Sequence, residues 1–271
     1  GWFTHPAIQG GQSNLDASSN YGTLDIIQAL RWVKENIGKF GGDENNITIF
    51  GESAGGHNVL ALLTSPLTMG LFHKAIAQSG YSTSTSLERA YDYGNKDSLI
   101  KRGSWRMVNE LLSTHYGPSF SQNKMSDHEV RQKLRDTDAK EFVRLYVGLR
   151  DEGSMPLTTA DGVVIPSMGL RNALESKVYA KNIPVISGTN RDELTLWLGV
   201  HRYFMDLSYP LTRLFPPFVK IRDPELYEFW VRVRSHAWKL RAVDDVLLRL
   251  DKAGYDNLRA YRFDWDDQKA S

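Results

Sequence analysis

Apolar residues recur along the chain at two spacings, and the alternation between them predicts strands interleaved with helices. Helical spacing predicts a helix over 23–37, preceded by a Gly-, Ser- and Asn-rich loop over 1–22. A β-branched run predicts a strand at 47–50, and the apolar stretch after residue 53 predicts a helix that ends before Pro66. Strands and helices in this order indicate an α/β fold with a mainly parallel sheet.

The rest of the chain predicts more strands of this sheet and two helical insertions beside it. The further strands are expected at 74–80, 183–188 and 258–265, giving a sheet of four to six strands. The insertions are expected at about 85–150 and 200–250, with helices over 99–112, 127–149 and 203–250. The second insertion has the Tyr, Phe and Trp content of a cap. We therefore expect a single domain over residues 1–271.

Composition narrows the classes of function. The 271 residues include 33 basic and 32 acidic ones, for a net charge of +1, and no basic stripe interleaved with aromatics, so nucleic acid is not an expected partner. The sequence has no apolar run long enough to cross a bilayer and no visible signal peptide. With no cysteine and no paired histidine spacing, we expect no disulfide and no metal site, and the compartment stays open.

The candidate chemistry lies at residues 51–55, which read Gly-Glu-Ser-Ala-Gly between the predicted strand and the predicted helix. A G-x-S-x-G turn in this context predicts a nucleophile elbow with Ser53 as the nucleophile. Gly51 and Gly55 are expected to leave room for the turn, because a Cβ there would collide with neighbouring backbone. The Ala54 amide would lie at a helix N-terminus and favour a developing oxyanion. The alternative is a strand–turn–helix link with an incidental serine.

Seven segments together carry a family resemblance. They are NYGTLD at 20–25, ALRWV at 29–33, FGGD at 40–43, ITIFGESAGG at 47–56, AQSG at 77–80, GTNRDE at 188–193 and YRFDW at 261–265. In this order they resemble the type-B carboxylesterase family, the cholinesterase-like branch of the α/β hydrolases. The resemblance covers nearly the whole chain. It implies a partial α/β-hydrolase fold, with residues 1–271 forming one incomplete domain with helical cap insertions.

The resemblance also implies a catalytic triad in the order serine, glutamate, histidine. The serine maps onto Ser53 and the acid onto Glu193, where a carboxylate can accept an imidazole N–H and stabilise the imidazolium. Glu193 as a surface or salt-bridged carboxylate is the alternative, and Asp192 is the adjacent rival. The hydroxyl of Ser79, at the end of the next strand, either supports Glu193 or makes a plain strand-end hydrogen bond.

The family places its histidine in a loop beyond Trp265, and its Gly-rich oxyanion loop would precede Gly1. No histidine of this chain lies there, so we assign no base among His5, His57, His73, His115, His128, His201 and His236. His57, on the helix that follows Ser53, is expected to point away from the site. Loss of one oxyanion donor costs about 10²–10³ in turnover, and loss of the base costs about 10⁶.

We therefore expect a central fragment of an esterase that is close to inactive alone. Its incomplete sheet would expose an edge, which predicts poor solubility or pairing with missing segments of the same enzyme. The leading hypothesis for the enzyme is hydrolysis of a small-molecule carboxylic ester through an acyl-enzyme, without cofactor or metal. The alternatives are a non-catalytic cholinesterase-like protein-interaction module, whose members generally lack the nucleophile, and an inactive fragment. Trp197, Tyr203 and Phe204 are either pocket residues or cap-core aromatics.

Overall fold

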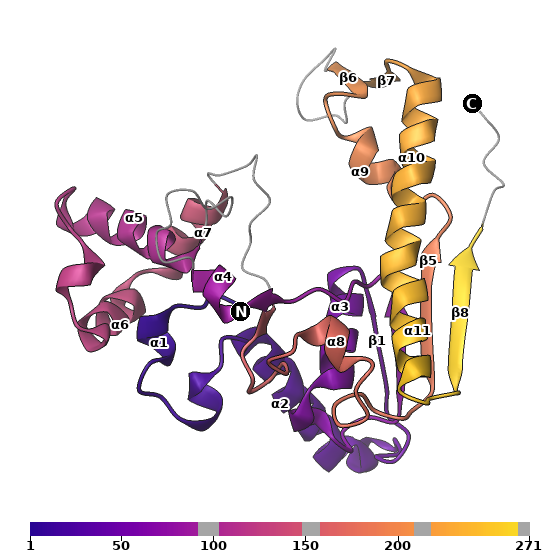
Figure 1. The fold of residues 1–271 in the computed structure, drawn as a ribbon, viewed down its shortest axis with the longest axis horizontal. Coiled ribbons are helices and arrows are strands. Elements are labelled where there is room, and N and C mark those ends of the chain that lie inside the picture. The colour runs from indigo at the N-terminus through magenta and orange to yellow at the C-terminus, as the bar shows by residue number, and fades with distance from the viewer. Residues whose placement is uncertain (92–102, 148–157, 209–217, 265–271) are drawn as a thin grey trace. The chain divides into compact units, whose positions relative to one another are not determined.

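The computed structural model describes residues 1–91, 103–147, 158–208 and 218–264, which divide into two compact units (Figure 1). The helical unit comprises Gly1–Ile47, Ala61–His73 and Thr83–Lys181. The sheet unit comprises Thr48–Leu60, Lys74–Ser82 and Asn182–Ser271. Helix α3 (Ala54–Thr64) begins in the sheet unit and ends in the helical unit, and it confirms the helix predicted before Pro66.

The sheet unit contains four parallel strands in the order β1-β2-β5-β8. Each strand lies within two residues of its predicted bounds, and residue 265 lies outside the described residues. The mainly parallel sheet is therefore confirmed, with β1 and β8 as its edge strands among the described residues. The bounds are β1 Thr48–Glu52, β2 Lys74–Gln78, β5 Val185–Asn190 and β8 Leu258–Phe263.

A glycine in the middle of the sheet makes room for an aromatic ring. Gln78, Gly188 and Tyr261 pair across three neighbouring strands. A Cβ added to Gly188 would lie 2.1 Å from the Tyr261 ring, so the ring occupies the space over this glycine. Glycine weakens a strand in general, but here it permits the close approach of a neighbouring side chain.

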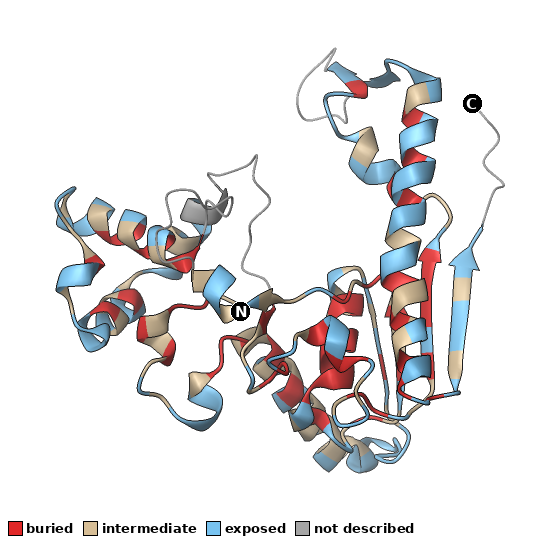
Figure 2. Ribbon diagram, in the orientation of Figure 1, coloured by how far each residue is buried: buried red, intermediate tan, exposed pale blue. Residues whose placement is uncertain are grey.

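One face of the sheet is covered and the other is exposed. On the covered face Ala75 and Val185 are buried, and the buried Ser187 hydroxyl donates to the carbonyl of Ala242 at 2.9 Å. On the other face Phe50 is 74% exposed and Ile186 is 37% exposed. The strands differ as well: Figure 2 shows that β5 is largely buried, whereas the edge strand β8 is exposed or half-buried.

The remaining elements of the sheet unit correct one prediction. The region 203–250 was expected to be helical, but Met205 pairs with Ile221 in an antiparallel hairpin. Backbone hydrogen bonds to a partner strand therefore outweigh the weak helical pattern in that region. These elements are α9 (Thr195–Gly199), β6 (Met205–Ser208), β7 (Phe218–Ile221), α10 (Pro224–Lys239), a π-helical turn (Leu240–Asp244) and α11 (Asp245–Lys252).

The helical unit contains the predicted first helix as α2 (Tyr21–Asn36), but the loop predicted over 1–22 is partly helical. Pro6 occupies the first turn of α1, and the His5 side chain caps this helix by accepting from the Ala7 amide at 3.1 Å. The unit also contains α1 (Pro6–Gln9), 3₁₀ turns at Asn14–Ala17, Ile37–Phe40 and Pro66–Thr68, β3 (Thr85–Ser86), α4 (Leu87–Tyr91), β4 (Thr159–Ala160) and α8 (Leu170–Ala173).

The helices predicted over 99–112 and 127–149 differ from those observed. The first is α5 (Ser104–Tyr116), and residues 99–102 lie outside the described residues. The second is divided into α6 (Asp127–Asp136) and α7 (Ala139–Val147), because Thr137 adopts an extended conformation that ends α6. Residues 148–149 lie outside the described residues. A 3₁₀ turn at Gln122–Lys124 connects α5 to α6.

Candidate active site

Ser53 forms a one-residue turn between β1 and α3. Its φ is +54°, a conformation that a non-glycine residue adopts at a cost of about 1 kcal/mol. Two backbone hydrogen bonds hold it there, from Ser53 N to Gln78 O at 2.9 Å and from His57 N to Ser53 O at 3.0 Å. The strained strand-to-helix turn predicted at Ser53 is therefore present.

Glycines allow the backbone around this turn to approach itself closely. A Cβ on Gly51 would lie 2.4 Å from the carbonyl carbon of Gly55, as predicted, whereas a Cβ on Gly55 would meet nothing within 4 Å. The steric prediction for Gly55 is therefore wrong. Gly56 supplies the second close approach, because its Cβ would lie 2.7 Å from Gln78 O and 2.8 Å from Gly80 Cα. The first turn of α3 thus lies directly against the chain that follows β2.

Ala54 is the first residue of α3, and its amide points out of the helix end. Ala54 is exposed, and none of the described residues accepts a hydrogen bond from its N–H. Free amides and the helix dipole favour negative charge at a helix N-terminus. The Ala54 N–H is therefore free to donate to an oxyanion formed at Ser53.

Glu193 follows the end of β5, and one of its oxygens is saturated with hydrogen bonds. Oε2 accepts from Ser79 Oγ at 2.9 Å, from Thr189 Oγ1 at 2.7 Å and from the Asn190 amide at 2.9 Å. Oε1 accepts no hydrogen bond from any residue that the structure describes. The hydrogen bond predicted from Ser79 as one of two alternatives is present. A carboxylate held in this way has a fixed direction and one oxygen left for a further donor.

Ser79 itself has unusual geometry. It is buried, its φ is +50°, and its N–H donates to Gly188 O at 2.7 Å. Ser53, Ser79 and Glu193 thus follow β1, β2 and β5, three adjacent parallel strands. Since the carboxyl ends of parallel strands lie at one edge of a sheet, these residues share that edge.

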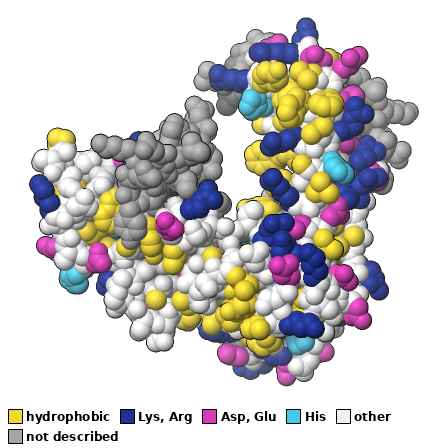
Figure 3. Space-filling model, in the orientation of Figure 1, with side chains coloured by type: hydrophobic (Ala, Val, Ile, Leu, Met, Phe, Trp, Pro, Cys, Tyr) yellow, Lys and Arg dark blue, Asp and Glu magenta, His cyan; other side chains and the backbone are white. Residues whose placement is uncertain are grey.

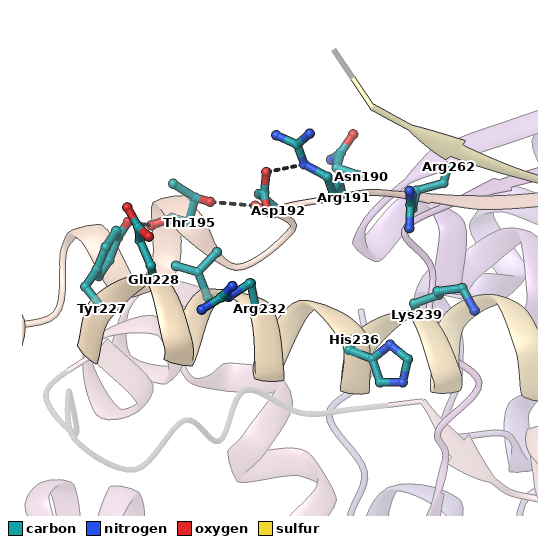
Figure 4. A pocket seen from close by; sticks show the side chains of 11 residues that line it. Asn190, Arg191, Asp192, Thr195, Tyr227, Glu228, Arg232, His236, Lys239 and Arg262 are labelled. Atoms are coloured by element: carbon teal, nitrogen blue, oxygen red, sulfur yellow. Dashed lines mark hydrogen bonds and ion pairs between the residues drawn. The ribbon is translucent and has the colours of Figure 1, made fainter. Parts of the chain in front are cut away.

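Asp192 points to a different place from its neighbour Glu193. Its carboxylate pairs with Arg191 Nε at 2.8 Å, and its carbonyl accepts from Thr195 Oγ1 at 2.7 Å (Figure 4). Asp192 lines a pocket of about 850 Å³ between α10 and the turn after β5, which contains neither Ser53 nor Glu193. The other residues that line this pocket are Asn190, Arg191, Thr195, Tyr227, Glu228, Val231, Arg232, His236, Lys239 and Arg262.

No histidine in the described part of the chain hydrogen-bonds to Glu193. His57 is buried, its ring stacks on Tyr81 with centroids 4.4 Å apart, and its Nδ1 lies 2.7 Å from Tyr81 O. Because a carbonyl only accepts, Nδ1 carries the proton. Burial lowers the pKa of His57 below its ordinary value, and the bond to Tyr81 opposes this shift. His57 therefore acts between α3 and Tyr81 as a neutral donor.

The three aromatic residues after Glu193 have different surroundings. Trp197 is 68% exposed, whereas Phe204 is buried against Met205, Tyr227 and Val231. Tyr203 is exposed and shares a pocket of about 350 Å³ with Phe204. Figure 3 shows hydrophobic side chains on the surface near the N-terminal end of α10, at the top of the view.

Several residues of the site were not predicted. Thr189 and the Asn190 amide bind Glu193, and Gly56 and Gly80 allow α3 to approach the end of β2. The doubled glycine at 55–56 and the glycine of AQSG are the sequence signals that would have identified the second close approach.

Within the described ranges, no group of three or more His, Asp and Glu residues is placed to hold a metal ion, and no helix has the length and apolar character to span a bilayer.

Comparisons with known proteins converge on one family. A model described as the carboxylesterase family matches residues 11–207. Liver carboxylesterase 1 of Oryctolagus cuniculus is 33% identical over 194 residues, which cover 71% of this chain and 32% of that protein. Carboxylesterase 1C of Rattus norvegicus is 37% identical over 174 residues, covering 64% of this chain and 28% of that protein.

Solved structures show the same likeness. A PNB esterase has a TM-score of 0.66 at 26% identity, covering 94% of this chain and 51% of that one. A carboxylesterase of Geobacillus stearothermophilus has a TM-score of 0.65 at 26% identity, covering 100% of this chain and 55% of that one. The α/β-hydrolase class predicted for the fold is therefore confirmed. The chain spans about half the length of these structures and 32% or less of the two curated relatives.

Proposed function

We propose that this chain, which belongs to the carboxylesterase family, carries the nucleophile and the triad acid of a serine carboxylic ester hydrolase. The observation that carries the proposal is the state of Glu193. Three donors fix its Oε2 while Oε1 stays open, at the sheet edge where Ser53 adopts a positive φ. A serine nucleophile and an oriented carboxylate are two of the three members of a triad, and a histidine is the third.

The reaction begins when Ser53 Oγ attacks the ester carbonyl carbon, while an imidazole takes the hydroxyl proton. The Ala54 N–H donates to the oxyanion of the tetrahedral intermediate. The imidazolium then protonates the leaving alcohol, and the C–O bond to the alcohol breaks to give the acyl-enzyme. Water attacks the acyl carbon by the same route, which releases the carboxylic acid and restores Ser53.

The role of Glu193 is to hold the imidazole in one tautomer and to stabilise its cationic form. The saturated Oε2 keeps the carboxylate from rotating, so that Oε1 can accept the imidazole N–H in a constant direction. Asp192 does not suit this role, because its carboxylate is paired with Arg191. Glu193 is therefore the stronger candidate of the two adjacent acids.

We propose no base among the described histidines, because none hydrogen-bonds to Glu193 and His57 Nδ1 is used by Tyr81 O. Residues 1–271 alone should then hydrolyse esters slowly, since loss of the base lowers kcat by about 10⁶. A non-catalytic protein-interaction role is the second candidate, and the presence of both Ser53 and Glu193 speaks against it.

The proposal is tested by labelling with a fluorophosphonate probe, which reacts covalently with activated serines. The native protein that carries this sequence should label, Ser53→Ala should not, and Ser208→Ala, an exposed serine of β6, should label like the unmodified protein. Circular dichroism confirms that each variant is folded.

The other outcomes have definite meanings. A native protein that does not label overturns the esterase proposal and favours the non-catalytic role. Labelling of the isolated 271-residue chain at Ser53 overturns the statement that no described histidine acts as base, and it directs attention to His57 and His236.

A further inference from the structure

We propose that α10 positions the catalytic acid, with Ser235 and Trp238 as positioning residues for Glu193. This inference rests on the proposed role of Glu193 as triad acid. The two side chains make hydrogen bonds on the two sides of Glu193, one to the next residue of the chain and one to the residue that donates to its carboxylate. Among the described residues, neither side chain makes a hydrogen bond to Glu193 itself.

Ser235 holds the residue that follows the acid. Its Oγ accepts from the Leu194 amide at 3.1 Å, and both residues are buried. A buried amide without an acceptor is costly, so this hydrogen bond fixes where the chain runs directly after Glu193. The backbone on the C-terminal side of the acid is thereby tied to α10.

Trp238 holds the residue that donates to the acid. Its Nε1 donates to Ser79 O at 3.2 Å, and Ser79 Oγ in turn donates to Glu193 Oε2 at 2.9 Å. Ser79 has a φ of +50°, a strained conformation that persists only where its surroundings hold it. The indole is itself held by a T-shaped contact with the Tyr81 ring, in which the ring centroids are 6.0 Å apart and the ring planes make an angle of 74°.

The two side chains lie on one stripe of the helix. Residues 235 and 238 are three apart, so they project from the same face of α10. Two turns earlier on this stripe, Tyr227 donates its hydroxyl proton to Thr195 O at 2.8 Å. One face of a 16-residue helix thus makes three hydrogen bonds to the chain around Glu193.

These three hydrogen bonds position the chain around Glu193 and do more than pack α10 against it. An apolar contact could bury a similar area, but a hydrogen bond also fixes the direction in which the two groups meet. A displacement of about 1 Å in a catalytic group can cost about 10²-fold in rate. We therefore expect their loss to change turnover more than substrate binding.

The test uses the native protein with p-nitrophenyl acetate as substrate and fluorophosphonate labelling of Ser53. Trp238→Phe keeps an aromatic ring and removes the donor, and it should lower kcat about fivefold to tenfold with KM nearly unchanged. The matched control is Trp230→Phe on the same helix, whose indole makes no hydrogen bond to a described residue and which should leave kcat unchanged. Ser235→Ala is a second, independent variant and should also lower kcat.

A double-variant cycle separates positioning from a general loss of structure. Because Trp238 acts through Ser79, Trp238→Phe should have no further effect on kcat once Ser79→Ala is present. Equal effects of Trp238→Phe and Trp230→Phe, or full additivity with Ser79→Ala, would overturn the inference. Glu193→Gln in the same assay tests the underlying proposal: if it does not reduce labelling, the assignment of the acid fails, whatever Trp238 does.

Discussion

The nucleophile turn (residues 51–56, at the end of β1) and the acid turn (residues 189–193, at the end of β5) lie at one edge of the same sheet, but they are held by different means. The nucleophile turn is backbone against backbone, because Gly51 lies against Gly55 and Gly56 lies against Gly80. The acid turn is held by side chains, among them Ser79 and Thr189. The nucleophile turn therefore depends on glycines, which leave room for close backbone contacts. The acid turn depends on polar side chains, one nearby in sequence at Thr189 and one distant at Ser79.

The largest effect should come from filling the space in the nucleophile turn. Gly51→Ala places a Cβ 2.4 Å from backbone that cannot move without breaking the turn, so we expect a loss of stability of roughly 1–3 kcal/mol and little labelling of Ser53. Fluorophosphonate labelling and a urea unfolding curve measure the two effects.

Gly55→Ala is the matched control for this change. Its Cβ would meet nothing within 4 Å, and the residue lies in the first turn of α3, where alanine is preferred over glycine by about 0.5–1 kcal/mol. We expect Gly55→Ala to keep its labelling and to be at least as stable as the unmodified protein. A Gly55→Ala protein as damaged as Gly51→Ala would contradict the backbone account of this turn.

The same comparison explains what could be predicted from sequence. The nucleophile turn is encoded within residues 47–56, and both its strand and its helix are found where they were expected. Local patterns also gave the four strands of the sheet. Local patterns did not predict the pairing of β6 with β7, because that pairing depends on hydrogen bonds between two strands. They also did not predict α1, whose N-terminal cap is a histidine side chain.

The acid turn was predictable only in part. Glu193 came from the family resemblance, and residue types alone did not separate it from Asp192. Its contacts to Thr189 and Ser79 arise 4 and 114 residues away in sequence, and the link from Trp238 to Ser79 spans 159 residues. The two long-range contacts depend on how the strands and α10 pack together, which no local spacing specifies.

A moderate effect is expected from removing the donors to Glu193. Ser79→Ala and Thr189→Val each remove one of three hydrogen bonds to a charged oxygen, and each should slow labelling of Ser53 by about tenfold. The rate of fluorophosphonate labelling in the native protein gives the measurement. Labelling rates that match the unmodified protein in both single variants and in the double variant would show that the acid turn does not depend on these side chains.

The smallest effect concerns His57, which joins the two turns. It lies in the first turn of α3, four residues after Ser53, and its Nδ1 donates to the carbonyl of Tyr81, two residues after Ser79. Burial lowers the pKa of His57 below its ordinary 6.5. Above about pH 6.5 the imidazole is neutral in both the folded and the unfolded chain, so its full contribution to stability is present.

As the pH falls below about 6.5, the unfolded chain takes up a proton that folded His57 does not take up until its own lower pKa is reached. The free energy of unfolding should therefore fall, by at most about 1.4 kcal/mol per pH unit for this one group. Urea unfolding between about pH 7.5 and about pH 5 measures the slope, which should be shallower in His57→Gln and unchanged in His128→Gln, an exposed histidine of α6. If the free energy of unfolding of His57→Gln falls with pH as steeply as that of the unmodified protein, the contact between His57 and Tyr81 does not stabilise the fold through a neutral imidazole. The glycine contacts alone would then hold α3 against the end of β2.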